Sequence, residues 1–342
     1  MDGVQDAKRK SWLERVGRTP WLSGHLDRGP KTTPRDRGRE HSRMKPCAWY
    51  CGLIAASVCT LLAETPAARP AEKLQLRFGL AKFADYNPLA DIDKIGAWGF
   101  DYIEPAVTQT MELSDAEFEA ALAKARASKI RVEAMNMFLP GALKVTGPSV
   151  DREKVRAYVE KALARAEALG AKVVDFGSGA ARSVPAGFPR EQAWRQLQEF
   201  LRDCGSHIVS RKYGMVIGIE PMQKAESNIV NSIEEAWKLA RDTNHPKVRI
   251  MADFYHLAVE NEDAAAILEA GPYIVHTHIS NPGRGRVFPR DEAEDSRYAV
   301  FFGNLKRIGY SGRMSVEANT NDLQSDAKAG LEFMKRMYAK YQ

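Results

Sequence analysis

Short apolar runs alternate with amphipathic stretches along most of the chain. Eight of these runs are rich in β-branched and aromatic residues, and they are hydrophobic nearly throughout. That composition is typical of parallel strands buried on both faces. The pattern therefore predicts eight parallel strands. They lie at residues 76–80, 102–105, 132–138, 173–176, 216–220, 249–254, 273–279 and 314–317.

The segments between these runs have the periodicity of helices. In residues 151–169, for example, Val155, Val159, Ala162 and Ala166 recur at three- and four-residue steps, so they form one apolar face. Strands that alternate with helices indicate a parallel α/β fold. Eight such pairs, without a linker between them, predict a single (β/α)₈ TIM barrel over residues 72–342.

The N-terminal part of the chain differs from the rest. Residues 1–43 are rich in Arg, Gly, Pro and Asp and have no hydrophobic period, so we expect a disordered tail or a start codon assigned too far upstream. Met44 and Lys45 then precede the uncharged run 47–63, which small residues follow. This is the plan of a secretory signal peptide, although an uncleaved run could also anchor the protein in a membrane. Residues 44–71 therefore predict export to the periplasm or the medium, with membrane contact only through residues 47–63.

The positive charge of the chain does not extend to the predicted barrel. The whole chain has 50 Lys and Arg against 44 Asp and Glu, a net charge of +6, but residues 1–45 hold twelve of the former and six of the latter. Residues 46–342 therefore have no net charge, and we expect no nucleic-acid partner. Three of the four cysteines fall within residues 47–63 and only Cys204 lies beyond them, which argues against a disulfide framework.

Residues able to do chemistry collect where the last four predicted strands end. Glu220 ends the fifth strand, Asp253 lies in the sixth, His276 and His278 lie in the seventh, and Glu317 ends the eighth. Each alone could be a solvated strand-end residue or a core histidine. In a TIM barrel, however, the carboxyl ends of the strands form one rim, where active sites lie. Two Glu, one Asp and one His are an oxygen-rich set suited to Mn²⁺, Co²⁺ or Mg²⁺ and usable by Zn²⁺.

Four stretches of this part of the chain resemble the sugar phosphate isomerase/epimerase family, the xylose isomerase-like TIM barrels that include the ketose 3-epimerases. They are IEPMQKAESN at 219–228, MADFYH at 251–256, HTHIS at 276–280 and VEAN at 316–319. The resemblance implies one divalent metal ion, with four protein ligands: Glu220, Asp253, His278 and Glu317. It also implies three substrate-binding residues: Glu226, His256 and Arg284, with Arg286 near enough to take the place of Arg284.

Such a site could isomerise or epimerise a ketose or related sugar. A divalent ion acidifies the C–H bond beside a carbonyl and stabilises the resulting enediolate. One carboxylate then removes the proton and another returns it, and we expect Glu220 and Glu317 to fill these two catalytic roles. Return to the other face of the same carbon gives epimerisation, whereas return to the neighbouring carbon gives isomerisation. The sequence does not choose between these outcomes.

Three other functions remain open at this point. A metal-dependent dehydratase or lyase acting on a keto-sugar or keto-polyol would begin with the same proton removal. A non-catalytic sugar-binding protein would not need the carboxylates. A three-zinc nuclease of the same fold would need histidines on the earlier strands, and the chain has none between His41 and His207. Because phosphorylated metabolites are scarce outside the cytoplasm, we expect an unphosphorylated sugar. A homo-oligomer also stays open.

Overall fold

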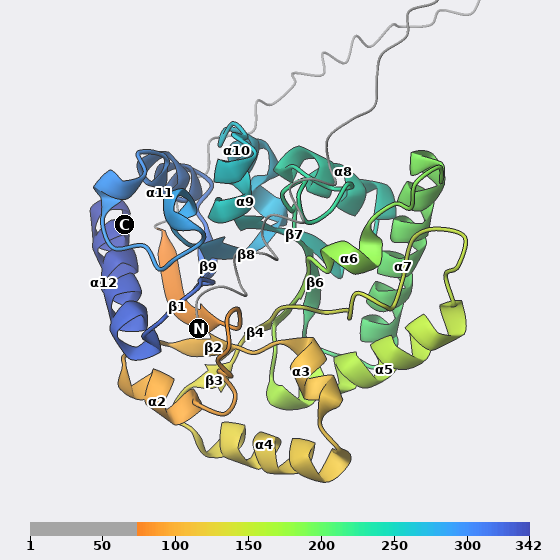
Figure 1. The fold of residues 1–342 in the computed structure, drawn as a ribbon, viewed down its shortest axis with the longest axis horizontal. Coiled ribbons are helices and arrows are strands. Elements are labelled where there is room, and N and C mark those ends of the chain that lie inside the picture. Colours follow the sequence, from red (N-terminus) through yellow and green to blue (C-terminus); the bar gives the residue numbers. More distant parts are fainter. Residues whose placement is uncertain (1–73) are drawn as a thin grey trace, which may run out of the picture. The chain divides into compact units, whose positions relative to one another are not determined.

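The computed structural model describes residues 74–342, which form one parallel sheet surrounded by helices (Figure 1). All strand pairings in this sheet are parallel, in the order β3-β2-β1-β9-β8-β7-β6-β5-β4. The strands are β1 (Gln75–Ala81), β2 (Tyr102–Glu104), β3 (Arg131–Val132), β4 (Ala134–Met135), β5 (Val173–Phe176), β6 (Val216–Ile219), β7 (Val248–Asp253), β8 (Ile274–Ile279) and β9 (Ser311–Val316).

The predicted third strand is divided in two, and this division closes the ring. β3 pairs with β2 and β4 pairs with β5, while only Glu133 separates β3 from β4 along the chain. The Glu133 backbone bonds to both sides, since its N–H donates to the Ile103 carbonyl at 3.3 Å and its carbonyl accepts from the Lys172 N–H at 2.8 Å. The nine strands therefore occupy the eight positions of a TIM barrel, as the sequence predicted.

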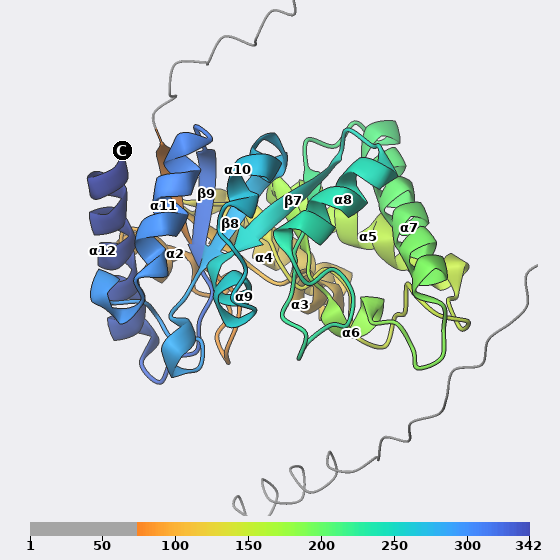
Figure 2. The ribbon, with the colours of Figure 1, turned by 90° about the horizontal axis from the view of Figure 1, so that it is seen from above.

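Helices form the outer layer, and Figures 1 and 2 show them around the sheet. The helix α5 buries the apolar face that its periodicity predicted, including Val155, Val159 and Ala162. The α-helices are α2 (Ile92–Ala97), α3 (Val107–Glu112), α4 (Asp115–Ala127), α5 (Arg152–Leu169), α6 (Gly179–Arg182), α7 (Arg190–Ser210), α8 (Ile233–Thr243), α9 (Phe254–Val259), α10 (Ala266–Ala270), α11 (Arg297–Arg307) and α12 (Leu323–Tyr341). Three short 3₁₀ helices are η1 (Gly271–Tyr273), η2 (Pro282–Arg284) and η3 (Glu292–Glu294).

Side chains fill the middle of the barrel, so it is a packed core and not a pore. Tyr102, Ala134 and Val173 cluster there, and the Tyr102 hydroxyl lies 2.8 Å from Ser315 Oγ. Gly79 is required at this level, because a Cβ at that position would overlap the Tyr102 ring. The barrel core therefore separates the two ends of the sheet. The polar side chains able to do chemistry lie at the carboxyl end of the strands.

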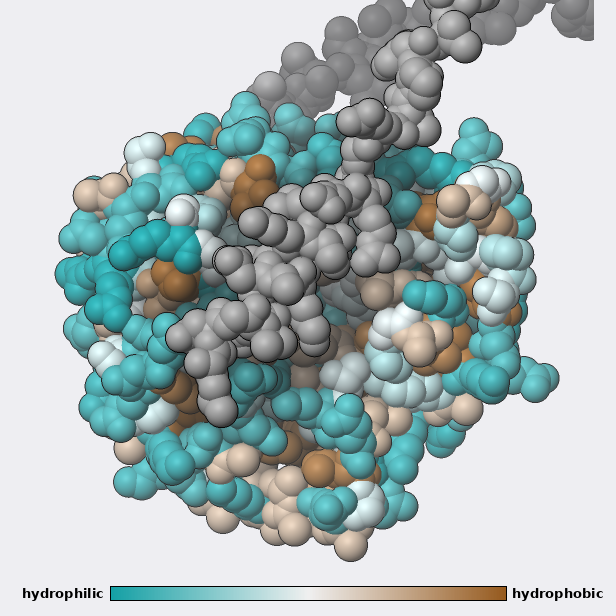
Figure 3. Space-filling model, in the orientation of Figure 1, coloured by the Kyte–Doolittle hydropathy of each residue, from teal (hydrophilic) through white to brown (hydrophobic). Residues whose placement is uncertain are grey.

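The surface carries mainly polar residues. In the face shown in Figure 3, hydrophilic side chains predominate around the periphery of the molecule. This is the arrangement expected of helices that bury their apolar face against a sheet.

Two predictions concern residues outside those that the structure describes, namely the tail 1–43 and the signal or anchor segment 44–71. Within residues 74–342, no helix is both long and apolar enough to span a bilayer.

Candidate metal and substrate site

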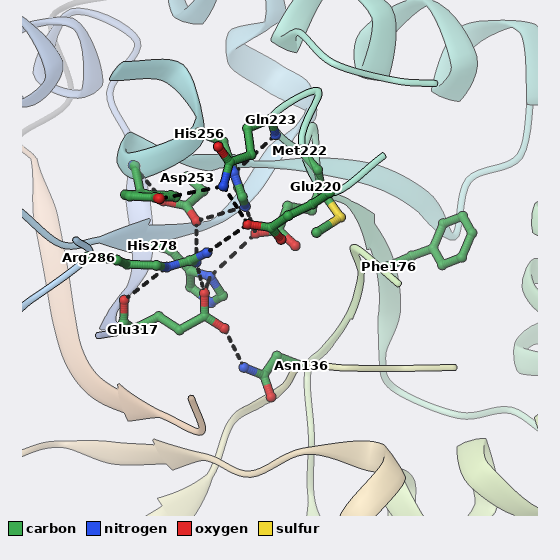
Figure 4. A network of polar contacts seen from close by, with 12 residues as sticks. Asn136, Phe176, Glu220, Met222, Gln223, Asp253, His256, His278, Arg286 and Glu317 are labelled. Atoms are coloured by element: carbon green, nitrogen blue, oxygen red, sulfur yellow. Dashed lines mark hydrogen bonds and ion pairs between the residues drawn. The ribbon is translucent and has the colours of Figure 1, made fainter. Parts of the chain in front are cut away.

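Glu220, Asp253, His278 and Glu317 come together at the carboxyl end of four adjacent strands (Figure 4). One donor atom from each residue lies within 4.8 Å of the others, and all four residues are buried. The register of the sheet produces this cluster, since Asp253 pairs with His278, and His278 pairs with Ser315 two residues before Glu317. The four predicted metal ligands therefore lie in one place.

The cluster contains three carboxylates and one imidazole, a set of donors that fits a cation. His278 Nε2 lies 3.1 Å from Glu104 Oε1, whereas His278 Nδ1 has no hydrogen-bond partner. That Nδ1 faces Glu317 Oε2 at 3.4 Å and Glu220 Oε1 at 3.7 Å. Burial lowers the pKa of His278, but Glu104 and Glu317 outweigh it and raise the pKa well above the ordinary value. The carboxylates thus attract positive charge to Nδ1, and a divalent ion with oxygen and imidazole ligands fits the same donors.

Arg286 supplies a fixed positive charge beside the cluster. Its Nη2 lies 2.8 Å from Asp253 Oδ2 and also bonds to the Glu317 carboxylate. The guanidinium lies close to two rings, 4.4 Å from the centre of Phe83 and 4.6 Å from that of Tyr255. Burial lowers the pKa of Arg286, but the carboxylates of Glu317 and Asp253 outweigh burial and raise it. Arg286 therefore stays charged and holds two carboxylates in place.

The structure brings Arg286, and not the predicted Arg284, into the cluster. The Arg284 side chain is 62% exposed and pairs with Glu294 at the surface. Gly285 and Arg286 both have positive φ, 75° and 62°, so the chain turns sharply between the two arginines. The family resemblance implied Arg284 and left Arg286 open, and the sequence alone does not show the turn that brings Arg286 inward.

The other two predicted substrate contacts, His256 and Glu226, lie next to the four ligands. His256 Nδ1 accepts a hydrogen bond from the Gln223 backbone N–H at 3.1 Å. The proton of the neutral ring therefore lies on Nε2, which has no hydrogen-bond partner and faces Asp253 Oδ2 at 3.6 Å. Glu226 is 37% exposed, accepts from Gln223 Nε2 at 2.6 Å and faces Arg286. The site thus offers one N–H donor and one accessible carboxylate beside the ligands.

Two residues from the early strands also reach the cluster. Asn136 donates from Nδ2 to Glu317 Oε1 and to the Lys82 carbonyl, both at 2.6 Å, and so fixes the direction of the Glu317 carboxylate. Glu104 contacts both His276 and His278, at 2.8 and 3.1 Å. The side chains of Glu104, His276 and His278 also lie close enough together to hold an ion. Because the Glu104 oxygens already bond directly to both imidazole rings, we interpret this group as a hydrogen-bonded support and not as a second metal site.

The loop after β5 contacts both the carboxylate and the backbone of Glu220. Gly177 lies against the Glu220 carboxylate, and a Cβ there would overlap Oε2. Arg182 is fully buried and donates to the carbonyls of Phe176 at 2.8 Å and Glu220 at 2.6 Å. Its guanidinium is therefore committed to the backbone, and this loop is a wall of the site.

Sequence reasoning missed Asp175. This residue lies in β5, is 2% exposed, and has no hydrogen-bond partner for Oδ1. Burial and the nearby Glu220 carboxylate raise the pKa of Asp175 well above its ordinary value. Within an apolar run such as VVDF, the acidic residue was itself the only available signal.

Comparisons with known proteins agree with the TIM-barrel fold. Residues 92–337 match the family described as xylose isomerase-like TIM barrel. The D-psicose 3-epimerase of Ruminiclostridium cellulolyticum is 26% identical over 247 residues, which cover 68% of this chain and 78% of that protein.

Two solved structures share the fold. A D-allulose 3-epimerase from Methylomonas in complex with D-allulose has a TM-score of 0.66 at 20% identity and covers 78% of this chain and all of the other. The 3-keto-D-glucoside 4-epimerase of Escherichia coli has a TM-score of 0.62 at 18% identity and covers 77% of this chain and 100% of the other.

Proposed function

The chain belongs to the xylose isomerase-like TIM barrel family, and we propose that it is a divalent-metal-dependent epimerase or isomerase of a ketose or related sugar. One observation carries the proposal. Four buried donors on adjacent strands lie within 4.8 Å of one another, and they include an unpartnered imidazole nitrogen facing carboxylates. The similarity to a D-psicose 3-epimerase supports the epimerase reading.

Glu220, Asp253, His278 and Glu317 would hold the ion. When bound, a divalent ion of this kind supplies Lewis-acid stabilisation of negative charge on neighbouring substrate oxygens. Mn²⁺, Co²⁺ and Mg²⁺ suit three carboxylates and one imidazole, and Zn²⁺ is also compatible.

We assign the proton transfers to Glu220 and Glu317. Burial raises the pKa of Glu220, but His278, His256 and Arg286 outweigh it and bring the pKa down to about 2. Glu220 is therefore ionised at neutral pH and able to accept the proton of the carbon beside the carbonyl. The electron pair of that C–H bond then forms the double bond of an enediolate. Glu317, in its protonated form, returns a proton from the opposite face, and the reverse reaction exchanges the two roles.

Substrate hydroxyls would meet the side chains around these two carboxylates. His256 presents the Nε2–H as a donor, and Glu226 presents a partly exposed carboxylate as an acceptor. Arg286 is the cation that contacts the cluster, and it already pairs with Asp253 and Glu317. A phosphate dianion would gain little there and would be repelled by the carboxylates. We therefore propose an unphosphorylated sugar, which also agrees with the export that residues 44–71 predict.

The test is solvent hydrogen exchange. The metal-loaded protein would be incubated in D₂O with a panel of free ketoses, their phosphates and keto-glycosides, and the products analysed by NMR and mass spectrometry. We expect deuterium at the carbon beside the carbonyl of a free sugar, together with its epimer or isomer. Glu220→Gln and Glu317→Gln should lower the rate by at least roughly 10²–10⁴-fold, because each removes a general acid–base group and also a proposed metal ligand.

Glu133→Gln provides a matched control, because Glu133 also belongs to the barrel wall but bonds to arginines. It should keep the rate of the unmodified protein. Loss of water from the substrate would replace the proposal with a dehydratase. An absence of exchange with every sugar in the metal-loaded protein would overturn it.

A further inference from the structure

We propose that Glu104 is a positioning residue that selects the ring nitrogen through which His278 binds the metal ion. The inference rests on the proposed metal site and adds a residue from the opposite part of the barrel wall. Glu104 ends β2, whereas His278 lies in β8, and β1 and β9 separate these strands in the sheet.

The first step concerns the geometry at His278. The two ring nitrogens face different surroundings: Nε2 lies 3.1 Å from Glu104 Oε1, and Nδ1 faces Glu317 Oε2 at 3.4 Å without a hydrogen bond. An ionised carboxylate only accepts hydrogen bonds, so Glu104 requires the proton on Nε2. Each Glu104 oxygen lies within hydrogen-bond distance of a different ring nitrogen, and this geometry leaves Nδ1 of His278 as the metal-binding nitrogen.

The second step concerns His276, which holds Glu104 in this orientation. Glu104 Oε2 lies 2.8 Å from His276 Nε2, so each carboxylate oxygen has its own ring. The two rings are nearly perpendicular, at 84°, with centres 4.9 Å apart. All three side chains have no solvent exposure. Rotation of the carboxylate would leave a buried N–H without a partner, which is unfavourable.

The third step concerns the space that Glu104 needs to reach across the barrel. On the two strands between β2 and β8, the register partners of Glu104 and His278 are small residues. Ala81 of β1 is the register partner of Glu104, and Ser315 of β9 is the register partner of His278. The sequence of the two intervening strands thus permits the contact.

Glu104→Gln tests the role directly. A carboxamide has one accepting oxygen and one donating nitrogen, so it cannot accept from both rings. Wherever the amide nitrogen faces His278, that ring must place its proton on Nδ1. Supporting contacts of this type typically contribute 10–100-fold to metal affinity. We therefore expect the dissociation constant for Mn²⁺, measured by equilibrium dialysis, to rise by roughly 10–100-fold.

Glu133→Gln is the matched control, since Glu133 bonds to Arg77 and Arg313 and not to a histidine. Its dissociation constant should equal that of the unmodified protein. An unchanged affinity in folded Glu104→Gln, as judged by circular dichroism, would overturn the inference while leaving the metal site intact. Failure of the unmodified protein to bind any divalent ion would overturn the proposed function and this inference together.

A second measurement does not depend on any variant folding. Imidazole ¹⁵N NMR of the unmodified protein loaded with diamagnetic Zn²⁺ reports which nitrogen is protonated. We expect His278 to show a protonated Nε2 and a metal-bound Nδ1. Metal bound at Nε2 would contradict the proposal.

Discussion

Gly177 lies directly against the Glu220 carboxylate, so a methyl group at position 177 would overlap Oε2. The close approach explains why glycine follows β5 here, since φ at Gly177 is not in the left-handed region. Gly177→Ala should displace Glu220 and weaken metal binding by about tenfold or more, comparable to the loss of a supporting contact. Equilibrium dialysis with Mn²⁺ measures this effect.

Gly303→Ala is a suitable control for that substitution. Gly303 lies within α11, and a Cβ there would meet its nearest atom, in Tyr341, at 3.8 Å. Removing a helix-interior glycine should raise the free energy of unfolding by up to about 1 kcal/mol. Equal loss of metal affinity in both variants would show that Gly177 has no special relation to Glu220.

The second prediction concerns Asn136, which donates to Glu317 Oε1. Asn136→Ala removes this hydrogen bond and frees the Glu317 carboxylate to rotate. We expect kcat to fall by about tenfold, which corresponds to about 1.4 kcal/mol of lost transition-state stabilisation. KM for the sugar should change much less, because Asn136 contacts the catalytic carboxylate in this structure. Steady-state kinetics separates the effect on kcat from the effect on KM. A rise in KM with constant kcat would contradict the role assigned to Asn136.

The third prediction compares the two neighbouring arginines. Arg286→Lys removes the planar group that contacts both Asp253 and Glu317, and lysine is a poor substitute at such a site. We expect kcat/KM to fall by about 100-fold, or about 2.7 kcal/mol. Arg284→Lys changes only a surface pair with Glu294, so its kcat/KM should stay within about twofold. The reverse ranking of these variants would assign the substrate contact to Arg284.

The fourth prediction concerns stability and pH in the metal-free protein. Burial and Glu220 raise the pKa of Asp175 above its ordinary value of 3.8. A carboxyl group that holds its proton more tightly in the folded state makes folding less favourable as pH rises above 3.8. Asp175→Asn removes this penalty, so it should raise the free energy of unfolding at pH 7 by roughly 1–3 kcal/mol.

Urea unfolding from pH 4 to 8 measures this effect. The difference in unfolding free energy between Asp175→Asn and the unmodified protein should grow with pH. A variant that is less stable than the unmodified protein at pH 7 would show that the Asp175 carboxylate has a favourable partner.

Much of the fold follows from the sequence, because the barrel strands are hydrophobic on both faces and the helices on one. The division of the third strand does not follow from it. At Glu133 the pairing changes from β2 to β5, because its N–H bonds to Ile103 and its carbonyl to Lys172, both distant in sequence.

The four proposed metal ligands could be predicted because each lies at or near the end of a strand, where the topology fixes its position, and in a stretch that resembles the family. Residues that act through another side chain carry no such signal. Arg286 reaches the cluster through a turn with two positive φ values, and Asp175 points inward from an otherwise apolar strand. Glu104 and Asn136 also lie at strand ends, but only the structure shows that they contact His278 and Glu317.

The most direct test of the account is the metal content per chain, measured by mass spectrometry after equilibration with Mn²⁺, Co²⁺, Mg²⁺ or Zn²⁺ and removal of unbound ions. Asp253→Ala and Glu317→Gln would be measured alongside, because Asp253 also caps α9 through the Tyr255 N–H and its removal affects that helix. The account predicts one ion per chain in the unmodified protein and a loss of that ion in both variants. No bound ion, or three zinc ions retained in both variants, would contradict it.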